Sequence, residues 1–118
     1  GRIKDFVRVK GENISSWEIE TNLNMHNDIS ESAILSTKAD IGEEDIIALL
    51  IAKNNKKPNL DKVALYFKKK LPKNYNPRYW CYVDKLPRTS TFRIDKKLIK
   101  INSLKLYDFL NKKFVYLE

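Results

Sequence analysis

The sequence predicts an α+β fold, in which two to three helices pack on one small mixed sheet that follows a short N-terminal hairpin. Three observations predict this class. A helix-capping pattern begins at Ser15, a second stretch from Leu60 repeats apolar residues at the helical period, and the run 46–52 is almost wholly Ile, Leu and Ala. Because two strand-like segments adjoin with no helix between them, helices against one sheet are favoured over a doubly wound arrangement.

The N-terminal part is predicted to form a hairpin and then a helix. Two short apolar stretches within residues 6–14 are separated by Gly11, which favours a turn. Ser15 stands three residues before Glu18, the spacing of a capping box, and apolar residues follow at i,i+4. We therefore expect a helix over residues 16–26.

The central part is predicted to contain two strands and a second helix. Residues 29–37 and 45–53 are strand-like, and residues 40–44, which include Gly42, form the turn between them. Asn59 is a suitable N-cap for a helix. Its apolar positions follow the helical period and are Leu60, Val63, Ala64, Phe67 and Leu71.

The C-terminal part is predicted to add a strand, a loop and a final helix. Residues 78–83 are rich in aromatic side chains and read as a strand, 86–93 as a loop, and 95–99 as a short helix. Beyond them the apolar residues recur every three or four positions, namely Leu106, Leu110, Phe114 and Leu117. We therefore predict a compact domain over 1–102 and a helical extension over 103–118.

Composition limits the possible function classes. The chain has 118 residues, enough for one core, and a net charge of +8, which favours a phosphate-bearing partner such as nucleic acid, an anionic membrane or a phosphorylated cofactor. The alternative is that many lysines only solvate the surface. The lone Cys81 is interpreted as structural, and since neither a membrane span nor a targeting pattern is visible, the cytoplasm is the expected location.

Two groups of residues resemble the motifs of a known superfamily. The first group is Gly1-Arg2-Ile3-Lys4-Asp5, Val9-Lys10-Gly11-Glu12-Asn13-Ile14 and Glu18-Ile19-Glu20; the second is Leu86-Pro87-Arg88-Thr89-Ser90-Thr91-Phe92-Arg93-Ile94. Their order and separation are similar to the C-terminal domain of adenylate-forming enzymes: acyl-CoA synthetases, peptide-synthetase adenylation domains and luciferase. Within that superfamily, residues 11–18 are most similar to fatty-acyl or carnitine-type CoA ligases.

The resemblance implies a part of a two-step ligase. In the family a carboxylic acid and ATP, with magnesium, give an acyl-adenylate, and a thiol such as coenzyme A then takes the acyl group. The small domain rotates between the two steps. A large N-terminal adenylation domain supplies nearly all contacts to ATP and the acid, so we expect a domain boundary at the hinge near Gly1 and an inactive isolated fragment. We expect a longer parent chain, and the alternative is a free-standing small subunit that works with a separate large domain.

The resemblance also assigns roles to residues near the N-terminus. Arg2 matches the family position that lies close to the nucleotide, and Lys4 matches the hinge. Gly11 matches a position that lines the coenzyme A tunnel, although a plain turn glycine explains it as well. Arg8 and Lys10 could bind the phosphates of coenzyme A, or serve only as surface charges.

The chain departs from the family at the catalytic lysine. Arg93 stands at the position of that lysine, and Phe92 replaces the preceding glycine, which removes a flexible backbone. Three explanations stay open: Arg93 does the work of the lysine, Lys96 or Lys97 reaches the site instead, or adenylation is impaired. In the last case acyl transfer from a supplied adenylate would remain.

Two other function classes are kept beside the ligase. A pseudo-enzyme that uses the fold only for interactions would explain the substitutions at 92 and 93. An RNA-binding module would need the strand aromatics Tyr79, Trp80 and Tyr82 on an open sheet face, whereas helices on the sheet would bury at least half of them. Nucleic acid is therefore not an expected partner, and the acid substrate, fatty or carnitine-like from the resemblance, is not defined by this part of the chain.

Overall fold

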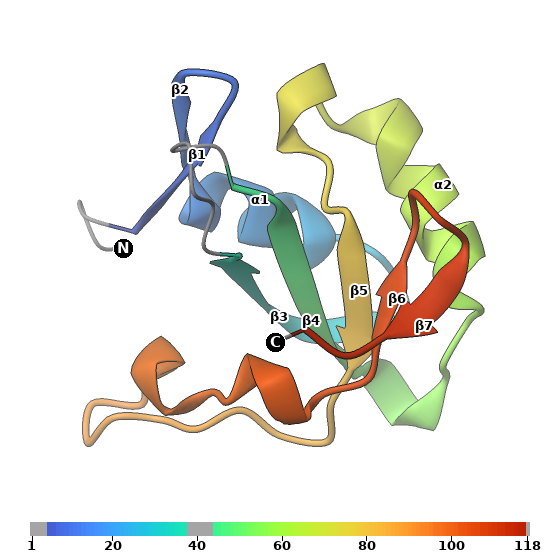
Figure 1. The fold of residues 1–118 in the computed structure, drawn as a ribbon. Coiled ribbons are helices and arrows are strands. Elements are labelled where there is room, and N and C mark those ends of the chain that lie inside the picture. Colours follow the sequence, from blue (N-terminus) through green and yellow to red (C-terminus); the bar gives the residue numbers. More distant parts are fainter. Residues whose placement is uncertain (1–4, 38–43, 118) are drawn as a thin grey trace.

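The protein is built on a five-stranded mixed sheet with helices on one face and a long irregular segment on the other (Figure 1). The structure is a computed structural model that describes residues 5–37 and 44–117. A separate two-stranded hairpin stands at the N-terminal side of the first helix. The predicted α+β class is confirmed.

The elements follow one another in the predicted order up to the fifth strand. They are β1 Phe6–Val9, β2 Glu12–Ser15, α1 Ser16–Leu23, β3 Ile29–Ser36, β4 Ile46–Ala52, α2 Leu60–Lys70, β5 Tyr79–Tyr82, β6 Leu106–Asp108 and β7 Lys113–Val115. Short 3-10 turns occupy Lys53–Asn55, Lys73–Tyr75, Lys96–Leu98 and Ile101–Ser103. The predicted turn at 40–44, with Gly42, lies largely outside the described residues.

Both helices begin where the sequence places their caps. The Ser15 hydroxyl accepts the Glu18 N–H at 3.4 Å, and the Asn59 side chain accepts the Asp61 N–H at 2.8 Å. Helix α1 ends at Leu23, three residues earlier than predicted, with Asn24 as its C-cap. The capping patterns therefore located both helix starts correctly.

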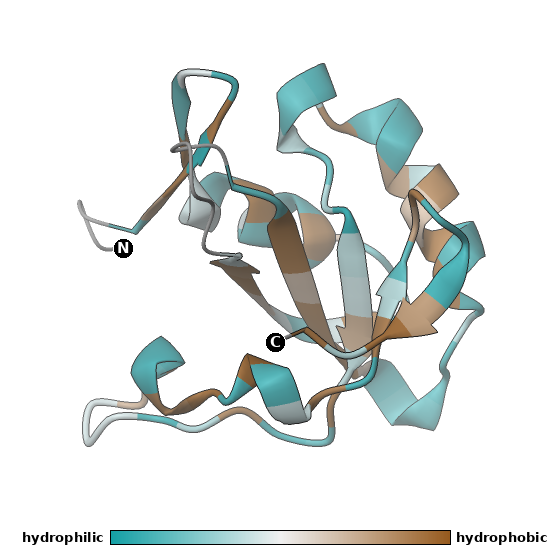
Figure 2. Ribbon diagram, in the orientation of Figure 1, coloured by the Kyte–Doolittle hydropathy of each residue, from teal (hydrophilic) through white to brown (hydrophobic). Residues whose placement is uncertain are grey.

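Strand β4 lies inside the sheet, between β3 and β5, and is apolar along its length (Figure 2). It pairs antiparallel with β3 and parallel with β5. Since successive strand residues point to opposite faces, Ala48 and Leu50 face the helices while Ile47 and Leu49 face the irregular segment. This explains why the run shows no alternation of polar and apolar residues.

The two sheet faces carry two separate apolar clusters. On the helix face, residues such as Ile19, Phe67 and Trp80 pack together, with the rings of Phe67 and Trp80 stacked at 6.0 Å. On the other face Leu86 and the partly buried apolar residues of 94–104 cover the strands and pack with strand residues such as Leu106. The segment after β5 is thus a structural layer and not a free loop.

The C-terminal extension is a hairpin and not the predicted helix. Strand β6 pairs with β5, and β7 pairs with β6, which places Leu106 in the core with no exposed surface. Asp108 accepts the N–H groups of Leu110 at 3.0 Å and Asn111 at 3.3 Å, and Lys112 has a φ of 56°. This Asx-type turn redirects the chain where a helix would have continued.

A partly buried arginine ties the C-terminal hairpin to the sheet. The Arg78 guanidinium donates from Nε and Nη2 to the two oxygens of Asp108, both at 3.0 Å, and from Nη1 to Asp45 at 3.1 Å. The Asp108 side chain is almost fully buried. These bonds join the start of β4, the start of β5 and the end of β6.

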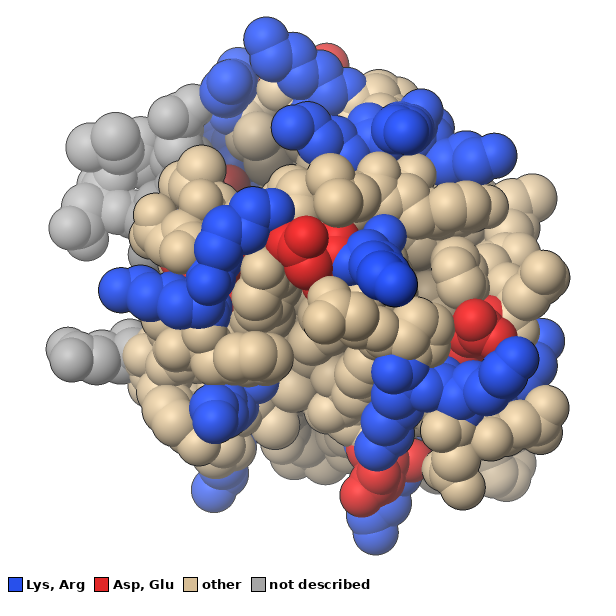
Figure 3. Space-filling model, turned by 90° about the vertical axis from the view of Figure 1, so that its right-hand side faces the viewer, with Lys and Arg blue, Asp and Glu red and all other residues tan. Residues whose placement is uncertain are grey.

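The face that carries α2 and the β6–β7 hairpin displays many Lys and Arg side chains (Figure 3). The exposed lysines on these elements are Lys62, Lys68, Lys69, Lys70, Lys105, Lys112 and Lys113. Several of them contact aromatic rings, as Lys112 lies 3.7 Å from the centre of the Phe109 ring. Within the described parts of the chain, no helix has the length and apolar character that crossing a bilayer requires.

Candidate functional site

The loop that carries Arg93 is closed into a tight tip. The N–H of Thr89 donates to the carbonyl of Arg93 at 2.8 Å, and the N–H of Arg93 returns a bond to the Thr89 hydroxyl at 3.2 Å. Arg88 and Ile94 form a single β-bridge at its base. The tip is therefore a defined turn that projects from the irregular layer.

Phe92 lies at this tip with a φ of 64°, in the left-handed region that favours glycine. Its side chain is 82% exposed. The sequence suggested that Phe92 removes the backbone freedom of a glycine. The structure shows that the chain keeps the glycine-like conformation at this position and accepts its strain.

The Arg93 side chain is exposed, and none of the described carboxylates lies within 4.0 Å of its guanidinium. Lys97 is also exposed, whereas Lys96 Nζ contacts Asp5 Oδ2 at 2.6 Å and Glu20 Oε2 at 2.8 Å. Lys96 could contact a substrate only if its ammonium group broke its contacts with both carboxylates. Among the described residues, Arg93 and Lys97 are thus free to meet an anion as the segment stands, whereas Lys96 is engaged with two carboxylates.

The second candidate region is the turn between β1 and β2. Lys10 has a φ of 50° and Gly11 a φ of 82°, the two positive values of a type I′ hairpin turn. A Cβ placed on Gly11 would meet nothing within 4 Å. The domain itself therefore needs Gly11 for the turn conformation and not for space.

Arg8 and Lys10 lie on the same hairpin as Gly11. The Arg8 guanidinium donates to the Asn13 side chain at 3.0 Å, and its backbone N–H donates to the carboxylate of Glu44 at 2.8 Å. The side chains of Arg8 and Lys10 are both exposed. The sequence-predicted coenzyme A residues are therefore close together.

The Arg93 loop and the Lys10–Gly11 turn lie at opposite ends of the molecule (Figure 1). Arg2 and Lys4, the expected nucleotide contact and hinge, lie outside the described residues.

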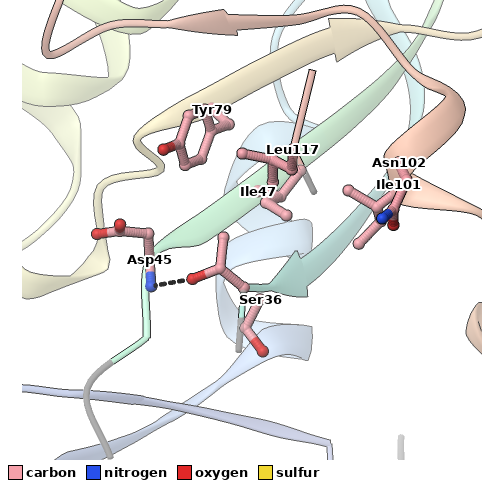
Figure 4. A pocket seen from close by; sticks show the side chains of 8 residues that line it. Ser36, Asp45, Ile47, Tyr79, Ile101, Asn102 and Leu117 are labelled. Atoms are coloured by element: carbon pink, nitrogen blue, oxygen red, sulfur yellow. Dashed lines mark hydrogen bonds between the residues drawn. The ribbon is translucent and has the colours of Figure 1, made fainter. Parts of the chain in front are cut away.

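A hollow of about 540 Å³ lies where β3 ends and β4 begins (Figure 4). Its lining comes from separate segments and comprises Ser36, Thr37, Asp45, Ile47, Tyr79, Ile101, Asn102 and Leu117. The Asp45 N–H donates to the Thr37 hydroxyl at 3.0 Å, and burial raises the pKa of Tyr79 against the opposing effect of Arg78. Sequence reasoning missed this hollow, because no motif links residues that only the fold brings together.

A broader groove of about 780 Å³ runs between α2 and the turn after β6. Apolar side chains such as Leu65, Leu71 and Phe109 line it beside Lys68 and Lys73. Among residues 5–37 and 44–117, His, Cys, Asp and Glu side chains nowhere form a group of three that could hold a metal ion.

The strand aromatics that motivated the RNA alternative are not displayed on an open face. Tyr79 and Trp80 are buried, and Tyr82 is partly buried with its hydroxyl donating to the Pro58 carbonyl at 2.6 Å. Cys81 is also buried, which raises the pKa of its thiol. The expectation that at least half of these rings belong to the core is confirmed, and the burial of Cys81 agrees with a structural role.

Comparison with curated proteins finds relatives among large multidomain enzymes. The chain is 33% identical to bacitracin synthase 1 of Bacillus licheniformis over 99 residues, 84% of this chain and 2% of that protein. It is 33% identical over 101 residues to 2-methylpropanoate–CoA ligase CCL4 of Humulus lupulus, and 31% identical over 109 residues to probable acyl-activating enzyme 6 of Arabidopsis thaliana. The chain spans 18% and 20% of these two proteins, and no family model matches it.

Solved structures of similar fold include acyl-CoA synthetases. An acyl-CoA synthetase from Brucella canis matches 83% of this chain with a TM-score of 0.72 and 28% identity, while the chain covers 19% of that protein. ATP-bound MatB from Rhodopseudomonas palustris matches 83% with a TM-score of 0.74 and 26% identity. The fold is thus that of the C-terminal domain of adenylate-forming enzymes, and the relatives of the chain are ligases and synthetases of this kind.

Proposed function

We propose that this chain is the C-terminal domain of an ATP-dependent acyl-CoA ligase, which activates a carboxylic acid as an acyl-adenylate and transfers it to coenzyme A. The observation that carries the proposal is the agreement between the motif order and the fold. The residues that resemble the second family motif form an exposed tip with a cation, on a fold shared with acyl-CoA synthetases. We place the family-like domain at residues 1–102, and residues 103–118 extend it by adding β6 and β7 to its sheet.

Arg93 carries the adenylation step in this proposal. A carboxylate oxygen bonds to the α-phosphorus of ATP and pyrophosphate leaves, which brings two anionic groups together. A fixed cation at that point offsets the negative charge. The exposed Arg93 guanidinium has no carboxylate partner among the described residues and suits this role, while its planar head requires a site different from that of an ammonium.

The hairpin turn serves the second step. The thiol of coenzyme A attacks the acyl carbonyl, and AMP leaves. Gly11 gives a backbone without a side chain beside the pantetheine arm, and Arg8 and Lys10 bind the phosphates. This turn and Arg93 lie at opposite ends of the domain, which supports a rotation of the domain between the steps, with Lys4 as the proposed hinge.

The remaining contacts belong to a large N-terminal domain of the same parent chain. That domain holds ATP and magnesium, while Arg2 adds a contact to the nucleotide. A fatty or carnitine-like acid is the proposed substrate, and the parent is expected to be cytoplasmic. The isolated 118-residue chain should therefore form no thioester by itself.

A pseudo-enzyme is the second candidate, and the strained tip favours it. Phe92 keeps a left-handed backbone at an energetic cost and exposes a large apolar ring beside Arg93. A protein that had lost adenylation would retain the fold for interactions. This alternative predicts that the natural residues at 92 and 93 do not support the first step.

The deciding experiment measures ATP-dependent thioester formation by the full parent chain with a panel of carboxylic acids. The natural protein, Arg93→Lys and Arg93→Met are compared. The ligase proposal predicts activity in the natural protein and a loss of about 10²- to 10³-fold in Arg93→Met. Activity found only in Arg93→Lys would favour the pseudo-enzyme.

A further inference from the structure

Three charged side chains form a compact cluster beneath the Arg93 loop. Lys96 Nζ lies 2.6 Å from Asp5 Oδ2 and 2.8 Å from Glu20 Oε2. The three side chains keep only 22%, 30% and 15% of their surface exposed. Because water screens these charges incompletely, the cluster is stronger than an ordinary surface ion pair.

Both acids of the cluster are bonded to the body of the domain. The Asp5 carbonyl accepts the N–H of Ser16 at the start of α1, at 3.1 Å. The Glu20 carboxylate accepts the N–H of Ile34 in β3, at 2.8 Å. The ammonium of Lys96 is therefore fixed relative to the first helix and the sheet.

The cluster joins two regions that the proposed function uses in different ways. Asp5 directly follows Lys4, the proposed hinge, and Lys96 is three residues beyond Arg93. The other side of the loop is held by the ion pair between Arg88 and Glu31. The tip that presents Arg93 is thus fastened on both sides.

We propose that Lys96 is a positioning residue, which fastens the hinge-side segment at Asp5 to the Arg93 loop so that both move as one rigid body. This inference rests on the proposed function. Asp5 then belongs to the rigid body of the domain, and rotation about the hinge delivers Arg93 to one fixed place. Without Lys96, the two carboxylates repel each other and the loop keeps only the ion pair between Arg88 and Glu31.

The first test compares two partial reactions of the full parent chain. Lys96→Met should lower the rate of acid-dependent ATP–pyrophosphate exchange about 10- to 100-fold with little change in KM for ATP, because the misplaced group acts in the chemical step. Thioester formation from a synthetic acyl-adenylate should change much less. Lys96→Arg should recover most of the exchange, and Lys100→Met, an exposed lysine, is the matched control.

The second test uses hydrogen exchange on the 118-residue chain and does not need activity. In Lys96→Met the amides of Ser16 and Ile34, which bond to Asp5 and Glu20, should exchange about 10-fold faster or more, while that of Leu49 in β4 stays protected. Asp5→Asn is a milder variant that should affect Ser16 alone. Unchanged exchange in both variants would overturn the positioning cluster.

The two proposals fail in different ways. A natural parent chain without either partial reaction contradicts the proposed function, while hydrogen exchange still decides whether the cluster fastens Asp5. An active parent whose Lys96→Met variant loses both partial reactions equally contradicts the positioning role, since general damage would then explain the loss.

Discussion

Phe92 has a backbone conformation that side chains other than glycine rarely adopt. The left-handed region costs an L-residue roughly 1–2 kcal/mol, and the exposed ring of Phe92 gains little from packing. The hydrogen bonds between Thr89 and Arg93 hold the turn closed against this cost. The strain therefore lies at the residue next to the proposed catalytic cation.

Phe92→Gly should stabilise the chain. We expect a gain of about 1 kcal/mol in the free energy of unfolding relative to Phe92→Ala, measured by urea denaturation, because only glycine relieves the positive φ. Phe92→Ala is the matched control, because it also removes the aromatic ring but keeps a Cβ. Equal stability of the two variants would show that residue 92 does not hold a positive φ in solution.

Cys81 should react slowly in the folded chain. It is buried, and burial raises the pKa of its thiol above the ordinary value of 9.0, so both access and thiolate content are low. Labelling with a thiol reagent at about pH 8 should be much slower in buffer than in denaturant. Rapid labelling of a chain whose circular dichroism is native would contradict the burial of Cys81.

At the scale of elements, the C-terminal hairpin depends on Asp108. Burial alone would raise the pKa of Asp108, but hydrogen bonds from Arg78 and from the N–H groups of Asn111 and Leu110 outweigh it and hold the pKa below its usual value. The ionised carboxylate is therefore the form that the fold stabilises.

Asp108→Asn should cost about 3 kcal/mol at neutral pH, because it leaves Arg78 partly buried without its bidentate partner. A lowered folded pKa means that the stabilisation is present above the unfolded pKa and disappears as the pH falls through the folded value. The gap between natural protein and variant should thus narrow below about pH 4. Urea denaturation of both proteins at a series of pH values measures this difference in the free energy of unfolding.

A matched ion pair on the surface gives the control. Lys57 and Asp84 lie 4.0 Å apart with 49% and 97% of their side chains exposed. Lys57→Met should change stability by less than about 0.5 kcal/mol. If Lys57→Met and Asp108→Asn lowered the free energy of unfolding by similar amounts, burial would not explain the strength of the Arg78–Asp108 pair.

The sequence predicted the elements that local signals define and failed where tertiary contacts decide. Capping residues located both helices, and the apolar run located β4. The spacing of Leu106, Leu110 and Phe114 also fits a helix, but Asp108 forms a turn and β5 offers an open edge for pairing. The pairing of β6 with β5 therefore decided the structure of this segment, against the helical spacing of its apolar residues.

The sequence predicted the parts of the candidate site that are local in sequence and missed the part that depends on tertiary contacts. The motifs identified the Arg93 loop and the Gly11 turn, since each is local in sequence. They could not identify the cluster at Lys96, because its acids come from residues 5 and 20 and meet it only in the folded chain.

For the whole molecule, removal of residues 104–118 should abolish cooperative folding. The deletion takes Leu106 out of the core and leaves Arg78 without Asp108, each of which costs about 3 kcal/mol or more. The sum is comparable with the total stability of a typical domain. Thermal denaturation followed by circular dichroism should show no sharp transition, and a sharp one would show that the extension is dispensable.

The position of β6 in the sheet also bears on how the protein is made. Residues 83–105 separate β5 from β6, so one edge of β5 has no partner until this segment and β6 have been made. Unpaired strand edges join readily to other chains. A nascent chain that stalls in the irregular layer after β5 is therefore a candidate for aggregation or for chaperone capture, until the last two strands arrive and close the sheet.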